Sequence, residues 1–207
     1  MAGEIVIAGE DRDRMLEDLL ERLGLPREAV EFEVQTENEE DLLPGARPQI
    51  QMHVRIRPQY LADVAASRTA DILNILGIEH EIQTELRGDM AFVRVSAPAA
   101  GAILIGRDGA TLDALQYIIN RMALRSSRDA PMIIVDIEDY RRRQFEKLED
   151  LAERALTHAR NTGNEIELDP MPALERKYLH YYLRDRDGVR TFSRGEEPDR
   201  FLVLLVD

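Results

Sequence analysis

The sequence contains no cysteine. Disulfide frameworks, zinc sites built on thiolates and cysteine nucleophiles are therefore excluded. It also has no stretch that approaches the ~20 apolar residues required by a membrane-spanning helix. Its first residues, 1–4, lack the basic segment and apolar run that mark a secretory signal. We therefore expect a cytoplasmic protein that is neither exported nor inserted into a membrane.

Patterns typical of enzymes are also missing. The sequence has no phosphate-binding loop and no dinucleotide fingerprint. The adjacent carboxylates Glu196 and Glu197 have no nucleophile or activated base near them in the sequence. The histidines fall in different predicted elements without metal-ligand spacing, at His53, His80, His158 and His180. We expect no catalytic residues, no metal, no cofactor and no small-molecule substrate.

The charge is unevenly distributed along the chain. The net charge is −13, which opposes indiscriminate binding to nucleic acid because phosphate contacts need Lys and Arg. Residues 1–64 hold 7 basic and 15 acidic side chains, whereas residues 141–207 hold 13 and 14. Phosphate contacts are therefore more plausible in the C-terminal third than at the N-terminus.

Hydrophobic periodicity predicts an α+β protein made of three small modules in series, at residues 1–64, 65–140 and 141–207. The first should be β-α-β-β, with strands near 5–7, 30–35 and 50–56 and a helix capped by Asp11 or Asp13 that Gly24 ends. The second should begin with a helix over 65–76. Two strands follow at 78–86 and 90–95, then a short helix, a GxxG loop, a longer helix and a strand at 132–135. The third should have helices over 140–161 and 172–183 and strands near 165–168, 189–193 and 201–206.

The strongest functional pattern is the string Ile105, Gly106, Arg107, Asp108 and Gly109 between two predicted helices. Two glycines around two polar residues let a sugar-phosphate backbone approach the main chain, and the next helix presents N–H groups to phosphate. Ile103, Ile105 and Leu112 are candidates for lining an apolar groove beside this loop, although all three are also candidates for the core. The alternative for the loop is a tight turn between helices.

A second pattern places Arg176 and His180 four residues apart, on one side of a predicted helix. A cation and an imidazole on an exposed face can bind adjacent phosphates or stack on a base. Lys177 and Arg200 are candidates for auxiliary phosphate contacts, as are Arg184, Arg190 and Arg194. The alternative for each is a solvated surface charge.

These motifs resemble known families. Residues 65–138 resemble a type II KH domain, in which the GxxG loop grips RNA backbone, and residues 143–207 resemble an R-three-H domain, which implies roles for Arg176 and His180. This order is similar to the Jag/KhpB family, and Leu16–Leu20 with Leu25–Val30 resemble its small N-terminal domain. Residues 37–45 depart from that pattern, because they are acidic where a Lys- and Gly-rich turn is expected.

The resemblance implies an RNA-binding protein that acts on single-stranded RNA, or on single-stranded DNA, as an RNA chaperone or post-transcriptional regulator. It also implies a complex with the small KH protein KhpA, links to cell-wall homeostasis and cell shape, and association with a membrane insertase. The competing hypothesis is a protein-interaction adaptor whose KH fold forms a homodimer and whose acidic N-terminal module docks a partner.

Overall fold

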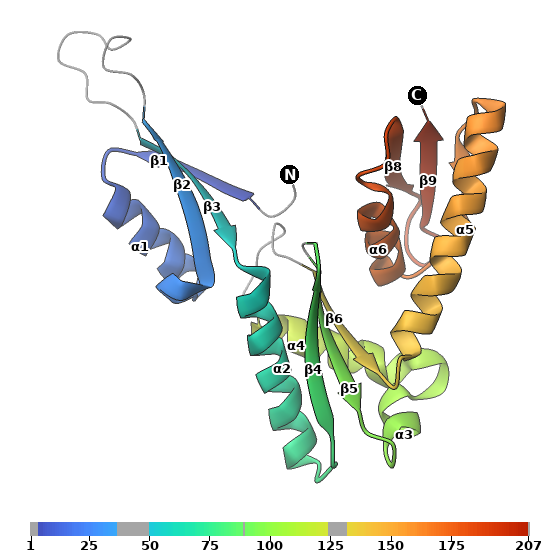
Figure 1. Cartoon of the computed structure of the whole chain (residues 1–207), viewed down its shortest axis with the longest axis horizontal. Helices are drawn as coiled ribbons and strands as arrows, with labels where there is room; N and C mark the ends of the chain where they lie inside the picture. Colours follow the sequence, from blue (N-terminus) through green and yellow to red (C-terminus); the bar gives the residue numbers. More distant parts are fainter. Residues whose placement is uncertain (1–3, 37–49, 89, 124–131, 207) are drawn as a thin grey trace. The chain divides into compact units, whose positions relative to one another are not determined.

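The computed structural model describes residues 4–36, 50–88, 90–123 and 132–206. These residues form a mixture of helices and strands, so the expected α+β class is confirmed. The chain divides into two compact units, residues 1–139 and 140–207. Unit 1 carries two three-stranded sheets and unit 2 carries one (Figure 1), and each sheet is described by itself below. The acidic stretch at residues 37–45 lies outside the described residues.

The N-terminal sheet has the order β1-β3-β2, with β1 (Glu4–Gly9), β2 (Val30–Thr36) and β3 (Ile50–Ile56) all antiparallel. Helix α1 (Arg12–Leu23) buries its leucine stripe, and a short 3-10 turn, η1 (Arg27–Ala29), precedes β2. Asp11 caps α1, as predicted, by accepting hydrogen bonds from the N–H groups of Asp13 and Arg14 at 3.0 and 3.1 Å. Gly24 ends the helix in the left-handed conformation, with φ 66°.

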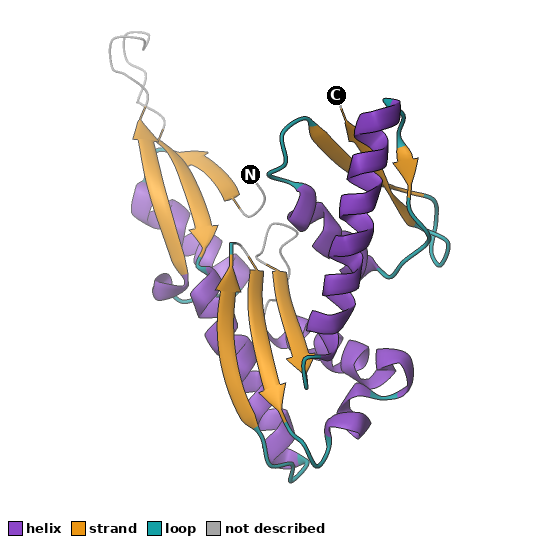
Figure 2. Cartoon of the chain, turned by 45° about the vertical axis from the view of Figure 1, so that its right-hand side comes forward, coloured by secondary structure: helices purple, strands orange, loops and turns teal. Residues whose placement is uncertain are grey.

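The middle sheet has the order β4-β5-β6, with β4 (Glu81–Arg87) antiparallel to β5 (Met90–Ser96) and β5 parallel to β6 (Met132–Ile137). Helices α2 (Pro58–Ile75) and α4 (Ala110–Ala123) lie behind the strands in Figure 2. The short helix α3 (Gly101–Ile105) and the turn η3 (Arg107–Gly109) precede α4. The described order of elements is helix, strand, strand, helix, GxxG, helix, strand, as the sequence predicts.

Helix α2 begins earlier than predicted. The prediction placed its start at residue 65, whereas the structure starts it at Pro58, which suits the first turn of a helix because proline has no N–H to satisfy there. The added turns bury Leu61 and Ala62 completely. The predicted boundary between residues 64 and 65 therefore falls inside a continuous helix.

The C-terminal sheet has the order β7-β9-β8, formed by β7 (Ile166–Glu167), β8 (Val189–Arg194) and β9 (Phe201–Val206). Helices α5 (Tyr140–Thr162) and α6 (Ala173–Leu183) pack against each other. Phe145 of α5 stacks on Tyr178 of α6, with ring centroids 3.9 Å apart, and the Tyr182 hydroxyl donates to Glu153 at 2.8 Å. The core of this unit includes Leu179, Leu202 and Leu204, all fully buried.

None of the helices in the described residues combines the length and the apolar character needed to cross a bilayer.

Candidate nucleic-acid interface

The residues Gly106–Gly109, which we call the GRDG loop, form a sharp turn between α3 and α4. Gly106, Asp108 and Gly109 have φ values of 73°, 52° and 84°, a left-handed region that glycine tolerates and that Asp adopts more readily than most residues. A Cβ atom on Gly106 would lie 2.2 Å from Thr111 Oγ1 and 2.9 Å from the Thr111 backbone nitrogen. Glycine is therefore required at position 106 for both its conformation and its lack of a side chain.

The loop is accessible to a ligand. Arg107 and Asp108 are exposed, Gly106 is half-buried, and Gly109 is buried beneath the turn. Helix α4 begins directly after the loop, and the first N–H groups of an α-helix have no partners within the helix. The loop thus combines an exposed main-chain turn, one exposed cation and one exposed carboxylate at the start of a helix.

The predicted groove residues divide into two groups. Ile103 is 74% exposed and Ile105 is half-buried, whereas Leu112 is fully buried. Leu112 is therefore a core residue, which is one of the two roles that its apolar character left open in the sequence.

Helix α4 also carries an exposed apolar row made of Tyr117, Ile118 and Met122, in which Tyr117 is 64% exposed. The buried face of this helix consists mainly of Leu112, Leu115 and Ile119. The hydrophobicity of the three exposed residues could not show that they face outward.

Glu138 helps to hold the segment that leads into the GRDG loop, and sequence reasoning missed it. Its carboxylate accepts a hydrogen bond from the Ala97 N–H at 2.6 Å, just before α3. A Cβ atom on Gly101 would lie 2.7 Å from Glu138 Cγ, so the side chain packs directly on the first residue of α3. Glu138 itself has φ 52°, and no pattern in the sequence marks this long-range contact.

Arg176 is not on an exposed face, which corrects the sequence-based expectation. It is 5% exposed, and its guanidinium donates to the carbonyl oxygens of Met171 and Arg200 and to the Glu197 carboxylate. Met171 precedes α6, and Glu197 and Arg200 belong to the connection between β8 and β9. Arg176 therefore ties two loops to α6, and its donors are engaged within the protein.

His180 is half-buried and joins α6 to β8. Its Nδ1 lies 2.7 Å from Thr191 Oγ1 and its Nε2 lies 3.2 Å from Ser193 Oγ. Burial lowers the pKa of His180, and the positive charges of Arg176 and Arg200 lower it further. The predicted pair is thus brought together on one side of α6, where both side chains bind other parts of the unit.

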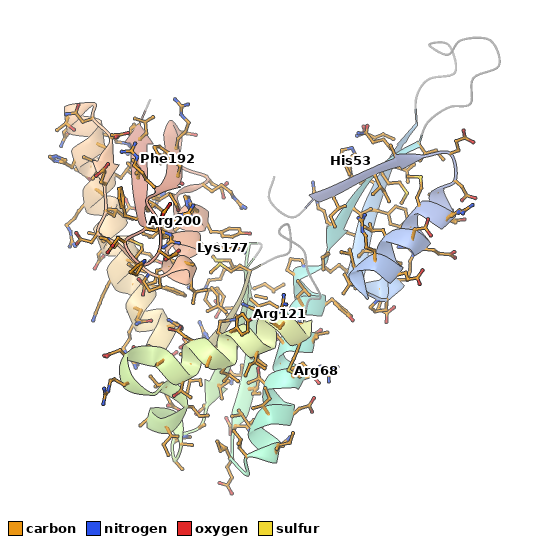
Figure 3. All side chains as sticks on the ribbon, turned by 180° about the vertical axis from the view of Figure 1, so that it is seen from behind. His53, Arg68, Arg121, Lys177, Phe192 and Arg200 are labelled. Carbon is orange, nitrogen blue, oxygen red and sulfur yellow. The ribbon has the colours of Figure 1, made fainter. Side chains whose placement is uncertain are left out.

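All five auxiliary residues of the prediction remain at the surface, namely Lys177, Arg184, Arg190, Arg194 and Arg200. Lys177 and Arg200 are exposed, and both are labelled on the C-terminal unit in Figure 3. Partial desolvation lowers the pKa of Lys177. The Arg200 side chain lies close enough to His180 to affect its titration. Lys177 and Arg200 are therefore better placed than Arg176 to meet a phosphate.

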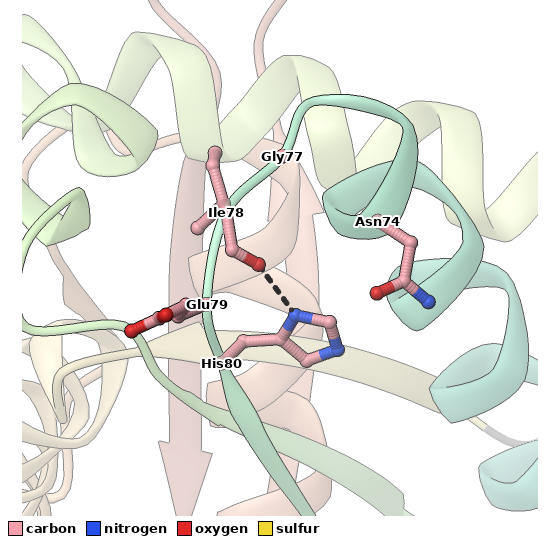
Figure 4. Close-up of a pocket in the computed structure, with 5 residues that line it drawn as sticks. All are labelled: Asn74, Gly77, Ile78, Glu79 and His80. Carbon is pink, nitrogen blue, oxygen red and sulfur yellow. Dashed lines mark hydrogen bonds between the residues drawn. The ribbon is translucent and has the colours of Figure 1, made fainter.

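A shallow pocket of about 490 Å³ lies where α2 meets β4. Its lining consists of Asn74, Gly77, Ile78, Glu79 and His80 (Figure 4), and His80 Nδ1 lies 2.9 Å from the Ile78 carbonyl oxygen. The pocket contains none of the predicted site residues. In the described ranges, no three His, Cys, Asp or Glu side chains are grouped so that they could hold a metal ion.

Comparison with known proteins supports the C-terminal motif and identifies relatives of the chain. Residues 146–205 match the R-three-H domain family. The RNA-binding protein KhpB of Clostridium symbiosum is 36% identical over 126 residues, which cover 61% of this chain and 52% of that protein. The KhpB protein of Lactiplantibacillus plantarum is 28% identical over 162 residues, covering 72% of this chain and 50% of its own length. The chain thus spans about half the length of these two relatives.

A third relative matches along almost the whole chain. The RNA-binding protein KhpB of Bacillus subtilis is 28% identical over 213 residues, which cover 97% of each protein. Together with the R-three-H match in the C-terminal unit, this places the chain in the KhpB family, also called Jag.

Proposed function

We propose that this protein binds single-stranded RNA, with the GRDG loop as the main contact and the R-three-H domain as a second one. The observation that carries the proposal is the open, left-handed turn at Gly106–Gly109, where Arg107 is exposed at the start of α4. Such a turn lets the phosphate backbone reach main-chain N–H groups without obstruction by Cβ atoms. The curated relatives carry the name RNA-binding protein, which agrees with this function.

Residues 65–140 are proposed to be a type II KH domain, between the N-terminal module at 1–64 and the R-three-H domain at 141–207. The order of elements around the GRDG loop and the parallel pairing of β5 with β6 support this assignment. The additional turns of α2 would then belong to the connection from the N-terminal module. RNA bound at both the KH and R-three-H domains would gain avidity if both engage one strand.

The affinity of the GRDG loop alone should be modest. Asp108 is exposed beside Arg107, so its carboxylate opposes the attraction of a phosphate. Lys177 and Arg200 would add contacts on the C-terminal unit, whose charge is nearly balanced. Single-stranded DNA offers the same phosphates, and competition between RNA and DNA oligonucleotides would separate the two ligands.

A matched pair of substitutions in the GRDG loop tests the proposal. Arg107→Glu should weaken binding to a fluorescent oligouridine by about tenfold, and Asp108→Asn should strengthen it by about twofold, because each changes the charge at one exposed position. Asn tolerates the left-handed conformation of residue 108. Gly109→Asp is less suitable, since Gly109 is buried with φ 84° and the substitution would strain the fold. If anisotropy titrations give the same oligouridine affinity for the wild type and for both variants, the proposal is contradicted.

A protein-interaction role is a second candidate, favoured by the exposed row Tyr117, Ile118 and Met122 on α4. An apolar row on a helix suits a second KH domain, either in a KhpA-like small KH protein or in another copy of this chain. Sedimentation should then show a complex that Ile118→Asp abolishes, and a monomer in every mixture would remove this candidate. Docking of a membrane insertase and links to post-transcriptional control, cell-wall homeostasis and cell shape remain proposals from the family.

A further inference from the structure

Strand β4 forms an open edge of the middle sheet (Figure 1). In the order β4-β5-β6 it pairs with β5, and its other side meets no strand of the described chain. The strand is seven residues long, contains no proline, and pairs with β5 in a continuous register. Proteins usually protect such an edge with proline, a bulge or charged side chains, because its unpaired N–H and C=O groups can bind another strand. Only charged side chains are present on β4.

The backbone groups that face outward belong to Ile82, Thr84 and Leu86. In the hairpin of β4 and β5, Arg87 lies opposite Met90 across a two-residue connection. The pair that closes such a hairpin is hydrogen-bonded, and hydrogen-bonded pairs then alternate along the two strands. The odd-numbered residues of β4 therefore direct their N–H and C=O groups to β5, and the even-numbered residues direct theirs away from the sheet.

The outward edge of β4 is complementary to a second copy of itself. When two β4 strands pair antiparallel with Thr84 opposite Thr84, Ile82 lies opposite Leu86 and Glu81 lies opposite Arg87. Each combination occurs twice, because the pairing has two-fold symmetry. Leu86 is 41% exposed and Ile82 is half-buried, so each apolar pair covers surface that a single chain leaves in water. Apolar pairs and opposite charges directly across two strands stabilise their pairing.

The charges also favour this register over its neighbour. With Thr84 at the centre, the remaining pair is Gln83 opposite Glu85, so no like charges face each other. Glu85 forms an ion pair with Arg94 of its own chain, which compensates its charge. A shift of the centre to Ile82 would instead place Glu85 opposite Glu79. The pairing of side chains thus selects the register in which the outward backbone groups of both strands also meet.

We propose that β4 is a self-association surface, through which two copies of this chain join their middle sheets into one continuous sheet. This surface is separate from the apolar row on α4. The GRDG loop belongs to elements at the opposite edge, since α3 contacts β6. RNA contact and self-association would therefore use different parts of the middle module, and a dimer would carry two GRDG loops. The proposal does not depend on RNA binding.

Sedimentation velocity of the full chain, without RNA and over a wide concentration range, tests the proposal. The wild type should shift from monomer to dimer as its concentration rises. Thr84→Pro should remain monomeric, because it removes the N–H at the two-fold axis. Proline is tolerated on an edge strand where its missing N–H faces outward. Thr84→Val keeps both the N–H and a β-branched side chain, so it should dimerise like the wild type.

An exchange of charges tests the register. Glu81→Arg and Arg87→Glu each place like charges across the interface, so each variant alone should dimerise about tenfold more weakly than the wild type. In a heterodimer of the two variants, opposite charges again face each other at both positions. An equimolar mixture should therefore recover the dimer that each variant has lost.

Each outcome decides the proposal. A wild type that stays monomeric, a Thr84→Pro variant that dimerises like the wild type, or a mixture of charge variants that stays monomeric overturns it. Dissociation by Ile118→Asp together with an intact dimer in Thr84→Pro would assign the contact to α4 and also overturn it. If circular dichroism shows that Thr84→Pro does not fold, the mixture of charge variants decides. Since RNA is absent, a failure of the proposed RNA binding would leave these results unchanged.

Discussion

In the sequence, the GRDG loop and the Arg176–His180 pair both look like ligand-binding motifs. In the structure, their polar side chains differ in exposure and in the partners that they bind. In the loop, Arg107 and Asp108 are exposed and the glycines allow a main-chain turn. In the C-terminal unit, Arg176 is buried among loop carbonyls and Glu197, and His180 is hydrogen-bonded to two hydroxyl groups of β8. One motif leaves its polar groups available to a ligand, whereas the other uses them to hold its own fold.

If this comparison is correct, Arg176→Ala should mainly reduce stability. The change leaves two carbonyl oxygens and a carboxylate without their donor, which should lower the free energy of unfolding of the C-terminal unit by about 3 kcal/mol. Thermal and urea unfolding would measure the loss. An unchanged unfolding midpoint with strongly reduced RNA affinity would instead make Arg176 a direct ligand contact.

In the first unit, Glu138→Ala should have a smaller effect on stability. It removes the acceptor for the Ala97 N–H before α3 and should cost about 1 kcal/mol. RNA affinity should fall as well, because the segment leading into the GRDG loop is less well held. Glu138→Gln keeps an acceptor oxygen and serves as the control. If Ala and Gln behave alike in both unfolding and anisotropy titrations, the positioning role of Glu138 is wrong.

Lys177→Ala combined with Arg200→Ala should weaken RNA binding by about fivefold, because both side chains are exposed and able to contact phosphate. The matched control is Arg154→Ala with Arg160→Ala, which removes the same charge from exposed positions of α5. Equal losses in the two double variants would mean that only net charge matters. The logarithm of RNA affinity should fall less steeply with the logarithm of salt concentration only in the variant that lacks Lys177 and Arg200.

The stability of the C-terminal unit should depend only weakly on pH, so this is the smallest of the expected effects. Since burial and two arginines lower the pKa of His180, the unfolded chain binds its proton more readily than the folded one. Stability should therefore fall as the pH drops below about 6.5, by less than about 1 kcal/mol. In the His180→Gln variant, the midpoint of urea unfolding should change less with pH over this range than it does in the wild type. A steeper dependence in the variant would contradict the assigned sign.

Local patterns predicted much of this molecule. The Asp11 cap, the stop at Gly24 and the GRDG loop all depend on short-range chemistry, which a sequence displays directly. The misses depend on distant partners. The burial of Arg176 requires Glu197 and Arg200, the role of Glu138 requires Ala97 and Gly101, and the exposure of Ile118 depends on how α4 packs. Spacing along the chain carries no signal for such contacts.

Chemical-shift mapping of the backbone amides during titration with single-stranded RNA tests the central claim most directly. The account predicts the largest changes at Gly106–Thr111, where phosphate would meet main-chain N–H groups, with smaller changes around Lys177 and Arg200. RNA that binds while the amides of the GRDG loop remain unperturbed would contradict the account.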